Sequence, residues 1–301
     1  MNKTSDEYNY VLITAARNEE MYIENTIKAI VSQTILPVKW IIVSDGSTDR
    51  TDEIVRQYST LYNFIHLMRR NICINTRVDF SSKVQAIKKG YENLRNTDYN
   101  FIGILDGDVT FDSCYYEDIL NKFSTNPRLG IAGGIILDQY DTHYRRRSPN
   151  NLNYVSGCIQ LFRRKCYEDI GGLLPIKEGG EDTIAAVKAQ IRGWEVKAFE
   201  SFKVYHHKHK QITQDKLKEA FRTGQMFYAL GSHPLFELLK SIKCIRMKPY
   251  LLFALIRMYG YLLPFLKNQK RPVTEEFILF LRNEQFSKIK VLFNKSSKDH
   301  A

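Results

Sequence analysis

The 301-residue sequence predicts an α/β fold, in which a mostly parallel central sheet is flanked by helices and followed by a helical C-terminal extension. Two observations support this prediction. Short apolar segments rich in β-branched residues alternate with segments whose apolar residues recur at helical spacing, which is the rhythm of right-handed βαβ crossovers. Beyond about Thr213 only the helical spacing continues. We therefore expect two regions, 1–210 and 211–301.

The first hundred residues supply the alternation. Strands are expected at 8–15, 38–44, 63–69 and 101–105, and helices at 23–31, 51–58 and 82–94, the last capped by its serine. Polar residues follow three of these strands: Arg17-Asn18, Asp45-Gly46 and Asp106-Gly107-Asp108. Because the carboxyl ends of parallel strands meet at one edge of a sheet, we expect these residues to lie close together.

The remaining elements are read in the same way. Helices are expected at 114–123, 164–170 and 183–192, and strands at 129–137, with a break at Gly133-Gly134, 154–162 and 194–199. The polar segment 141–153 is expected to be a mobile loop, whose Arg145-Arg146-Arg147 run either faces solvent or contacts a phosphate or the acceptor. The apolar segment 249–267 contains Arg257, Gly260 and Pro264, and is expected to form a helical hairpin or an interfacial segment.

The positive charge is concentrated in the C-terminal third. The chain has a net charge of +11, and residues 201–301 contain 19 Lys and Arg against 7 Asp and Glu. Such asymmetry indicates an anionic partner, either a membrane or a nucleic acid. Apolar residues with basic flanks favour an anionic membrane surface for 211–301, the alternative being a packed helical subdomain with a basic solvent face. No recognised nucleic-acid-binding motif is present, so no nucleic-acid partner is expected.

The cysteines and the N-terminus bear on location. The five cysteines are scattered and form no CxxC pair, which argues against a zinc site or a disulfide framework and suits a reducing cytosol. The first residues lack the apolar core of a signal peptide, and no segment supplies the roughly 20 apolar residues of a spanning helix. We expect a cytoplasmic protein, peripheral on the cytoplasmic face of the membrane if 211–301 binds lipid.

The Asp106-Gly107-Asp108 stretch could bind a metal ion. It follows a short apolar strand and places carboxylate oxygens where a phosphate-bearing ligand would lie, a setting that Mg²⁺ and Mn²⁺ favour. Asp45 could accept a hydrogen bond from a nucleobase, Asp106 could bind ribose hydroxyls, and Asp108 could hold a cation that bridges a diphosphate. The alternative is an acidic turn in which Gly107 adopts a positive φ.

Two later motifs also carry candidate chemistry. Glu181 and Asp182 begin a predicted helix, where a carboxylate can stay ionised and act as a base toward a hydroxyl, or merely cap the helix. Three histidines lie between His206 and His209. They either complete a metal shell or are structural.

Taken together, these motifs resemble a family 2 glycosyltransferase of GT-A fold, over roughly residues 8–210. The matching stretches occur in the family's order: Thr14-Ala15-Ala16-Arg17-Asn18-Glu19-Glu20, Ser44-Asp45-Gly46-Ser47-Thr48-Asp49, Lys83 to Gly90, Asp106-Gly107-Asp108, Ser156-Gly157-Cys158 with Arg163-Arg164, Glu181-Asp182 and the His206 region.

The resemblance implies an inverting hexosyl- or N-acetylhexosaminyltransferase that moves one sugar from a nucleotide-diphosphate donor, UDP-linked, to a hydroxyl of a glycan or lipid-linked acceptor. It implies Asp182 as general base with Glu181 beside it, and Mg²⁺ or Mn²⁺ held by Asp108 with His206 or His207. The residues implied in nucleotide-sugar binding are Ala15, Arg17, Asn18, Glu19, Asp45, Lys83, Asp106 and Gly107.

The sequence also departs from the family pattern. The Gln-x-x-Arg-Trp motif of processive members is absent, and Phe221 to Gln225 lie in that vicinity instead, so we expect one sugar to be added per encounter. A nucleotidyltransferase should carry a glycine-rich loop after the first strand, where Arg17 to Glu20 contain no glycine. A non-catalytic sugar-nucleotide-binding or membrane scaffold protein would be favoured only if a metal or base residue were missing.

Overall fold

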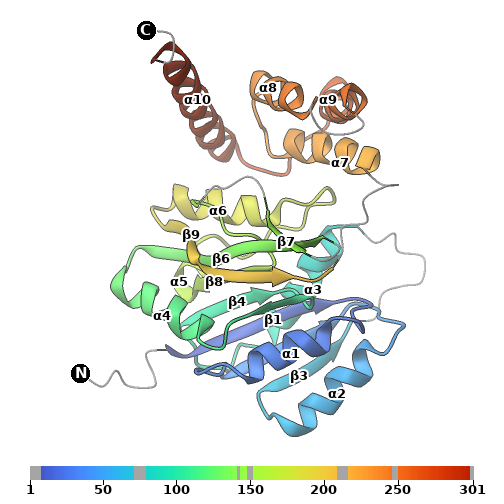
Figure 1. Cartoon of the computed structure of the whole chain (residues 1–301), viewed down its shortest axis with the longest axis vertical. Coiled ribbons are helices and arrows are strands. Elements are labelled where there is room, and N and C mark those ends of the chain that lie inside the picture. Colours follow the sequence, from blue (N-terminus) through green and yellow to red (C-terminus); the bar gives the residue numbers. More distant parts are fainter. Residues whose placement is uncertain are drawn as a thin grey trace. The chain divides into compact units, whose positions relative to one another are not determined.

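The computed structural model describes residues 8–70, 79–140, 143–147, 152–208, 216–245 and 250–298, with side chains of the last helix described to residue 290. The chain divides into two compact units. One comprises Met1–Pro175 and Glu181–Lys210, and the other Ile176–Gly180 and Gln211–Ala301. The first unit is built from strands and helices and the second from helices (Figure 1).

A single sheet organises the α/β unit, and its described strands follow the order β3-β2-β1-β4-β8-β6-β9-β5, with β7 paired to β6. In chain order the strands are β1 Tyr10–Ala16, β2 Lys39–Ser44, β3 Ile65–Arg69, β4 Phe101–Leu105, β5 Val109–Phe111, β6 Leu129–Tyr140, β7 His143–Arg146, β8 Ile159–Arg163 and β9 Glu195–His206.

The predicted α/β class is confirmed, with parallel pairing concentrated in the first half of the sheet. The strands β1, β2, β3 and β4 pair in parallel, as the alternation predicts. Antiparallel pairing begins where β8 joins β4, and it recurs between β8 and β6 and between β5 and β9. The strands β6 and β9 return to parallel pairing. The sheet is therefore mixed.

Helices cover both faces of this sheet (Figure 1). One core lies between the sheet and α1 Ile23–Val31, α2 Thr51–Leu61 and α4 Tyr115–Thr125. The other lies between the sheet and α3 Ser81–Glu92, α5 Arg164–Asp169 and α6 Glu181–Ile191. Successive residues of β1 alternate between the two cores, Tyr10 and Leu12 on one side and Val11 and Ile13 on the other. This alternation explains why the strand is apolar throughout.

Several local predictions were wrong. Residues 143–146 are not a loop but form β7 against β6, while 141–142 and 148–151 lie outside the described residues. The expected strand 154–162 begins only at Ile159, because the segment before it bends to meet α6. The break at Gly133-Gly134 is only a register irregularity within a continuous β6, where a Cβ on Gly134 would lie 2.3 Å from the carbonyl oxygen of Phe202.

The second unit contains α7 Lys216–Ala229, α8 Pro234–Cys244, α9 Leu251–Leu266 and α10 Glu275–Lys298. The expected helical hairpin in 249–267 was wrong, because the described residues 251–266 form one helix. Gly260 is the point at which α9 crosses α7, since a Cβ there would lie 2.1 Å from the carbonyl oxygen of Phe221. Among the described residues, no helix combines the length and the apolarity needed to cross a bilayer.

Candidate active site

The polar residues that follow the parallel strands meet at the carboxyl edge of the sheet, because β1, β2 and β4 lie side by side in register. Asp45 continues from β2, and its amide nitrogen donates to the carbonyl oxygen of Ala16 at 2.8 Å. Asp106 continues from β4, and its amide nitrogen donates to Cys158 at 3.0 Å. Ala15 is half-buried in β1 and Arg17 is exposed just beyond it.

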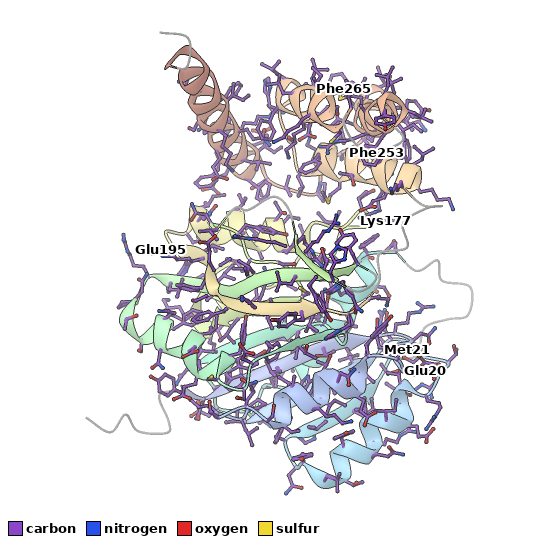
Figure 2. The ribbon with its side chains drawn as sticks, in the orientation of Figure 1. Glu20, Met21, Lys177, Glu195, Phe253 and Phe265 are labelled. Atoms are coloured by element: carbon purple, nitrogen blue, oxygen red, sulfur yellow. The ribbon has the colours of Figure 1, made fainter. Side chains whose placement is uncertain are left out.

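The loops after β1 and β2 are tied to each other. Asn18 adopts a φ of 53°, and its side-chain oxygen accepts from the amide of Thr48 at 2.9 Å. The amide of Glu19 donates to Oγ1 of Thr51 at 2.8 Å. Figure 2 labels Glu20 and Met21 in the same loop. These contacts fix the first two motifs as one structure, although about 30 residues separate them in the chain.

Asp45 lies in a polar cluster that the sequence motif alone does not indicate. One carboxylate oxygen is paired with Nε of Arg70, and the other accepts from Oγ of Ser82 at 2.7 Å. Ser82 therefore does not cap its helix as expected: α3 begins at Ser81 and makes no side-chain cap hydrogen bond at Phe80. A carboxylate held at the end of β2 in this way is preorganised to accept from a ligand.

Lys83 joins the strand-end carboxylates to the segment before β8. Its Nζ lies 2.6 Å from Oδ1 of Asp106 and donates to the carbonyl oxygen of Gly157 at 3.2 Å. Burial alone would lower the pKa of Lys83, but the negative charges of Asp106 and Glu181 outweigh it and raise that pKa. Lys83 is therefore a fixed positive charge among carboxylates.

Asp108 and His206 face each other at the end of β4. The two residues approach to 3.4 Å, measured from Oδ2 to Nε2, and His206 lies opposite Val109 in the β5–β9 pairing. Burial and the charge of Asp106 raise the pKa of Asp108, while His206 acts in the opposite direction. Oδ1 of Asp108 is buried and makes no hydrogen bond among the described residues, whereas Nδ1 of His206 lies 3.2 Å from Oδ1 of Asp138.

The unpartnered carboxylate oxygen of Asp108 fits a divalent cation better than it fits an acidic turn. Gly107 does not adopt the positive φ that the turn would use, and a Cβ there would lie 3.0 Å from Cδ1 of Ile23. The described ranges contain no group of three or more His, Cys, Asp or Glu arranged to hold a metal. Two protein ligands suit Mg²⁺ or Mn²⁺ when substrate phosphates and water complete the shell.

His207 engages both ring nitrogens elsewhere. Its Nε2 lies 2.7 Å from Oγ1 of Thr110, and its Nδ1 lies 3.0 Å from the hydroxyl of Tyr144. His209 lies outside the described residues. Of the described histidines in this run, His206 is therefore the one whose ring is turned to Asp108.

Glu19 forms an ion pair with a second lysine, Lys208, at this edge of the sheet. Its Oε1 lies 2.6 Å from Nζ of Lys208, just beyond β9, and its Oε2 is buried without a hydrogen-bond partner among the described residues. Burial raises the pKa of Glu19 to about 6, against the opposing hydrogen bond from Lys208. Burial alone would lower the pKa of Lys208, but the hydrogen bond and charge of Glu19, with a smaller contribution from Asp108, raise that pKa.

Glu181 and Asp182 begin α6 and contact the segment before β8. Oδ2 of Asp182 accepts from the hydroxyl of Tyr154 and, at 3.1 Å, from the amide of Gly157, while Oδ1 accepts from the amide of Thr183 at 2.7 Å. These three hydrogen bonds fix the orientation of the Asp182 carboxylate. Burial raises the pKa of Glu181, and the Lys83 charge opposes that rise.

Five residues join this site that the sequence motifs did not single out for it: Arg70, Ser82, Tyr154, Asp138 and Lys208. Arg70 follows β3 as Asp45 follows β2, so strand order could have indicated it. Asp138 reaches the site through the β6–β9 register, which the sequence does not reveal. Arg147, one of the three arginines, also donates to Asp138 at 2.9 Å and to Oγ of Ser156 at 3.1 Å.

Comparison with known proteins shows which family this chain resembles. The profile of glycosyl transferase family 2 matches residues 11–177, more than half of the chain. A poly-beta-1,6-N-acetyl-D-glucosamine synthase of Staphylococcus epidermidis is 24% identical over 177 residues, which are 53% of this chain and 40% of that protein. Its counterpart in Staphylococcus aureus strain COL is 25% identical over 206 residues, 62% of this chain and 46% of that protein. The chain thus spans less than half the length of these relatives.

Two solved structures share the fold. A mannosyltransferase from Pyrobaculum calidifontis in complex with GDP-Man and Mn²⁺ superposes with a TM-score of 0.54 at 16% identity, covering 90% of this chain and 78% of that one. The S. aureus TarS fragment 1-349 in complex with UDP-GlcNAc gives a TM-score of 0.51 at 14% identity, covering 84% and 71%. The GT-A fold predicted from the sequence is therefore confirmed.

Proposed function

Because the chain belongs to glycosyl transferase family 2, we propose that it is an inverting glycosyltransferase. It would move one UDP-linked hexose or N-acetylhexosamine to a hydroxyl of a glycan or lipid-linked acceptor, with donor binding and catalysis in region 1–210. The observation that carries the proposal is the meeting of Asp45, Asp106, Asp108 and His206 at one sheet edge, with Glu181 and Asp182 linked to it through Lys83 and Gly157.

The donor would lie along the carboxyl edge. Asp45, already held by Arg70 and Ser82, would accept from the nucleobase, and Asp106 would bind the ribose. Ala15, Arg17, Asn18 and Gly107 would form the walls near the nucleotide. Two cations, Lys83 and Lys208, are already present in this region to face the diphosphate.

A divalent cation fits this site because Oδ1 of Asp108 is buried without a partner among the described residues. Asp108 and His206 would hold Mg²⁺ or Mn²⁺. When bound, the ion would neutralise charge on the leaving diphosphate. The mannosyltransferase neighbour was solved with Mn²⁺, which supports the choice of ion.

The base would be Asp182. Its carboxylate would take the proton of the acceptor hydroxyl as that oxygen attacks the anomeric carbon and the bond to the diphosphate breaks. Tyr154 and the amides of Gly157 and Thr183 fix the position of the carboxylate before the reaction. In-line attack from the face opposite the leaving group inverts the anomeric configuration.

The acceptor and the donor sugar are proposed from the relatives and structural neighbours. The polysaccharide synthases among the relatives make a glycan acceptor the first choice, and the UDP-GlcNAc complex of TarS makes that donor the first to test. One sugar would be transferred per encounter, because the sequence lacks the Gln-x-x-Arg-Trp motif of processive members. Region 211–301 would bring the enzyme to an anionic membrane surface, where a lipid-linked acceptor would lie.

The test combines binding and product analysis. Thermal unfolding is measured with UDP-GlcNAc and with GDP-Man, each with Mn²⁺, since a bound ligand stabilises the folded state. We expect UDP-GlcNAc to raise the midpoint of wild type but not of Asp45→Ala, and proton NMR of any glycoside product to show inverted configuration. Stabilisation by GDP-Man alone would refute the UDP assignment, and a retained configuration would refute the mechanism.

A further inference from the structure

Two consecutive helices of the second unit each bury a charged residue and expose most of their large aliphatic residues. On α8, the side chain of Glu237 is 1% exposed, whereas Leu235 is 46% exposed. The exposed apolar residues recur at helical spacing and form one face: Leu235, Leu238, Leu239, Ile242 and Ile245. A helix that packs on a core in water normally shows the reverse arrangement.

The next helix repeats this inversion. On α9, Arg257 is 8% exposed, whereas Leu255 is 57% exposed. Phe265, labelled in Figure 2, is also exposed. The other exposed large apolar residues of α9 are Leu251, Leu252, Tyr259, Leu262 and Leu266.

A buried polar network fixes this orientation. Arg257 pairs with Glu237, and Oε1 of Glu237 accepts from Oγ of Ser232 at 2.6 Å. Ser232 in turn accepts from Gln285 of α10 at 2.8 Å. Turning either helix to bury its leucines would break the ion pair and leave a buried charge unpaired, which is strongly destabilising. The buried network therefore keeps the apolar faces of both helices exposed.

Both helices present their inner faces to α7. Nζ of Lys240 on α8 lies 4.0 Å from the ring centre of Phe227 on α7, and the guanidinium of Arg257 lies 5.0 Å from the same ring. Figure 1 shows α8 and α9 next to each other beside α7. The apolar faces of α8 and α9 therefore point away from α7 and together form one surface, which we call the leucine face.

The surrounding charge identifies the partner. Residues 238–274 contain eight Lys and Arg and no Asp or Glu. Of the described ones, Lys240 and Arg257 face inward, whereas Lys243, Lys267 and Lys270 are exposed. A second copy of the chain would bring these cations against each other, whereas an anionic bilayer offers phosphates beside hydrocarbon. We propose that the leucine face inserts into the interfacial layer of an anionic membrane, with the exposed Lys243, Lys267 and Lys270 at the headgroups. This specifies how the proposed membrane association occurs: by insertion of named apolar residues, not by charge alone.

The experiment measures binding of the full chain to vesicles of phosphatidylglycerol or of phosphatidylcholine, without nucleotide sugar. The variants are Leu238→Gln and Leu255→Gln, with Leu61→Gln, an exposed leucine of α2, as matched control. We expect tighter binding to phosphatidylglycerol, a loss of about tenfold for each leucine on α8 or α9, and no loss for the control. The substituted residues are exposed, so thermal unfolding should be unchanged.

A second measurement reports insertion directly. In Leu255→Trp, acyl-chain-brominated phosphatidylglycerol should quench the new fluorescence well beyond the quenching seen in wild type. Equal binding by the leucine variants and the control, or no added quenching, would overturn the proposal. The proposal would also be overturned if the wild-type chain did not bind vesicles but formed a dimer, and if Leu255→Gln dissociated that dimer. Because no donor is present, failure here leaves the proposed transfer reaction untouched, and failure of transfer leaves insertion untouched.

Discussion

Asp138 on β6 and His206 on β9 stand directly opposite each other in the sheet, with Oδ1 of Asp138 3.2 Å from Nδ1 of the imidazole. The other ring nitrogen of His206 faces Asp108. Arg147 holds the Asp138 carboxylate from the far side. A carboxylate behind a histidine in this way commonly orients the ring toward a metal.

Replacement of Asp138 by Asn should therefore weaken metal binding. We expect Mn²⁺ affinity, measured by electron paramagnetic resonance with UDP present, to fall by about tenfold to a hundredfold. Arg147→Gln is the matched control, because it breaks the same ion pair but leaves the carboxylate behind His206. Unchanged Mn²⁺ affinity in Asp138→Asn, with or without loss of stability, would refute a positioning role.

Asp182→Asn should abolish transfer and spare donor binding, because the amide cannot take the acceptor proton but keeps the shape of the side chain. We expect turnover to fall by at least about a hundredfold, with the dissociation constant of UDP nearly unchanged by calorimetry. Glu181→Gln is the comparison, since this neighbour should matter less. If Asp182→Asn turns over at the wild-type rate, another group is the base.

Asp45→Ala should weaken nucleotide binding, because it removes a carboxylate that would accept from the nucleobase. The expected loss of UDP affinity, measured by calorimetry, is about tenfold to a hundredfold. Asp118→Ala, at an exposed position of α4, controls for the change in net charge. Because Asp45→Ala also leaves Arg70 without its partner, thermal unfolding is followed in parallel. A UDP affinity equal to that of the control would remove Asp45 from the donor site.

Glu237→Gln should destabilise the helical unit by about 3–5 kcal/mol, because Arg257 would remain buried without a counter-charge. Urea unfolding, monitored by circular dichroism, gives the free energy of unfolding, and the exposed Glu276→Gln is the control. The double variant Glu237→Met with Arg257→Met should recover much of the loss, because no charge is then buried alone. A single variant as stable as wild type would show that the pair does not hold α8 to α9.

The first half of the fold could be predicted because its signals are local. β1, β2 and β4 are mostly apolar and buried, and each is followed by the polar residues that the site uses. The three-residue β5 could not be predicted, because its partner strand β9 lies about 95 residues later in the chain. A segment of three residues is also too short to show a periodic pattern of its own. The sequence His-Tyr-Arg-Arg of β7 is polar, so nothing local distinguishes it from a loop.

The candidate site divides along the same line. Residues in contiguous motifs, such as Asp106 and Asp108, can be recognised from the sequence, whereas the residues that contact and orient the site residues cannot. Arg70 and Asp138 reach the site only through strand order and register. In 249–267, Arg257 and Gly260 suggested a break in the helix. Instead, Arg257 forms a buried ion pair with Glu237, and Gly260 allows the close crossing of α9 and α7.

The inverted helices also change how sequence variation in this unit should be interpreted. In most domains, substitutions at buried leucines cost stability and substitutions at polar surface residues alter function. On α8 and α9 the proposed insertion would exchange these roles: Glu237 and Arg257 form a buried ion pair, while Leu238 and Leu255 are exposed and would act in membrane binding. A saturation scan scored once for abundance and once for activity would therefore separate the two sets, with the charged positions appearing in the first screen and the leucines only in the second.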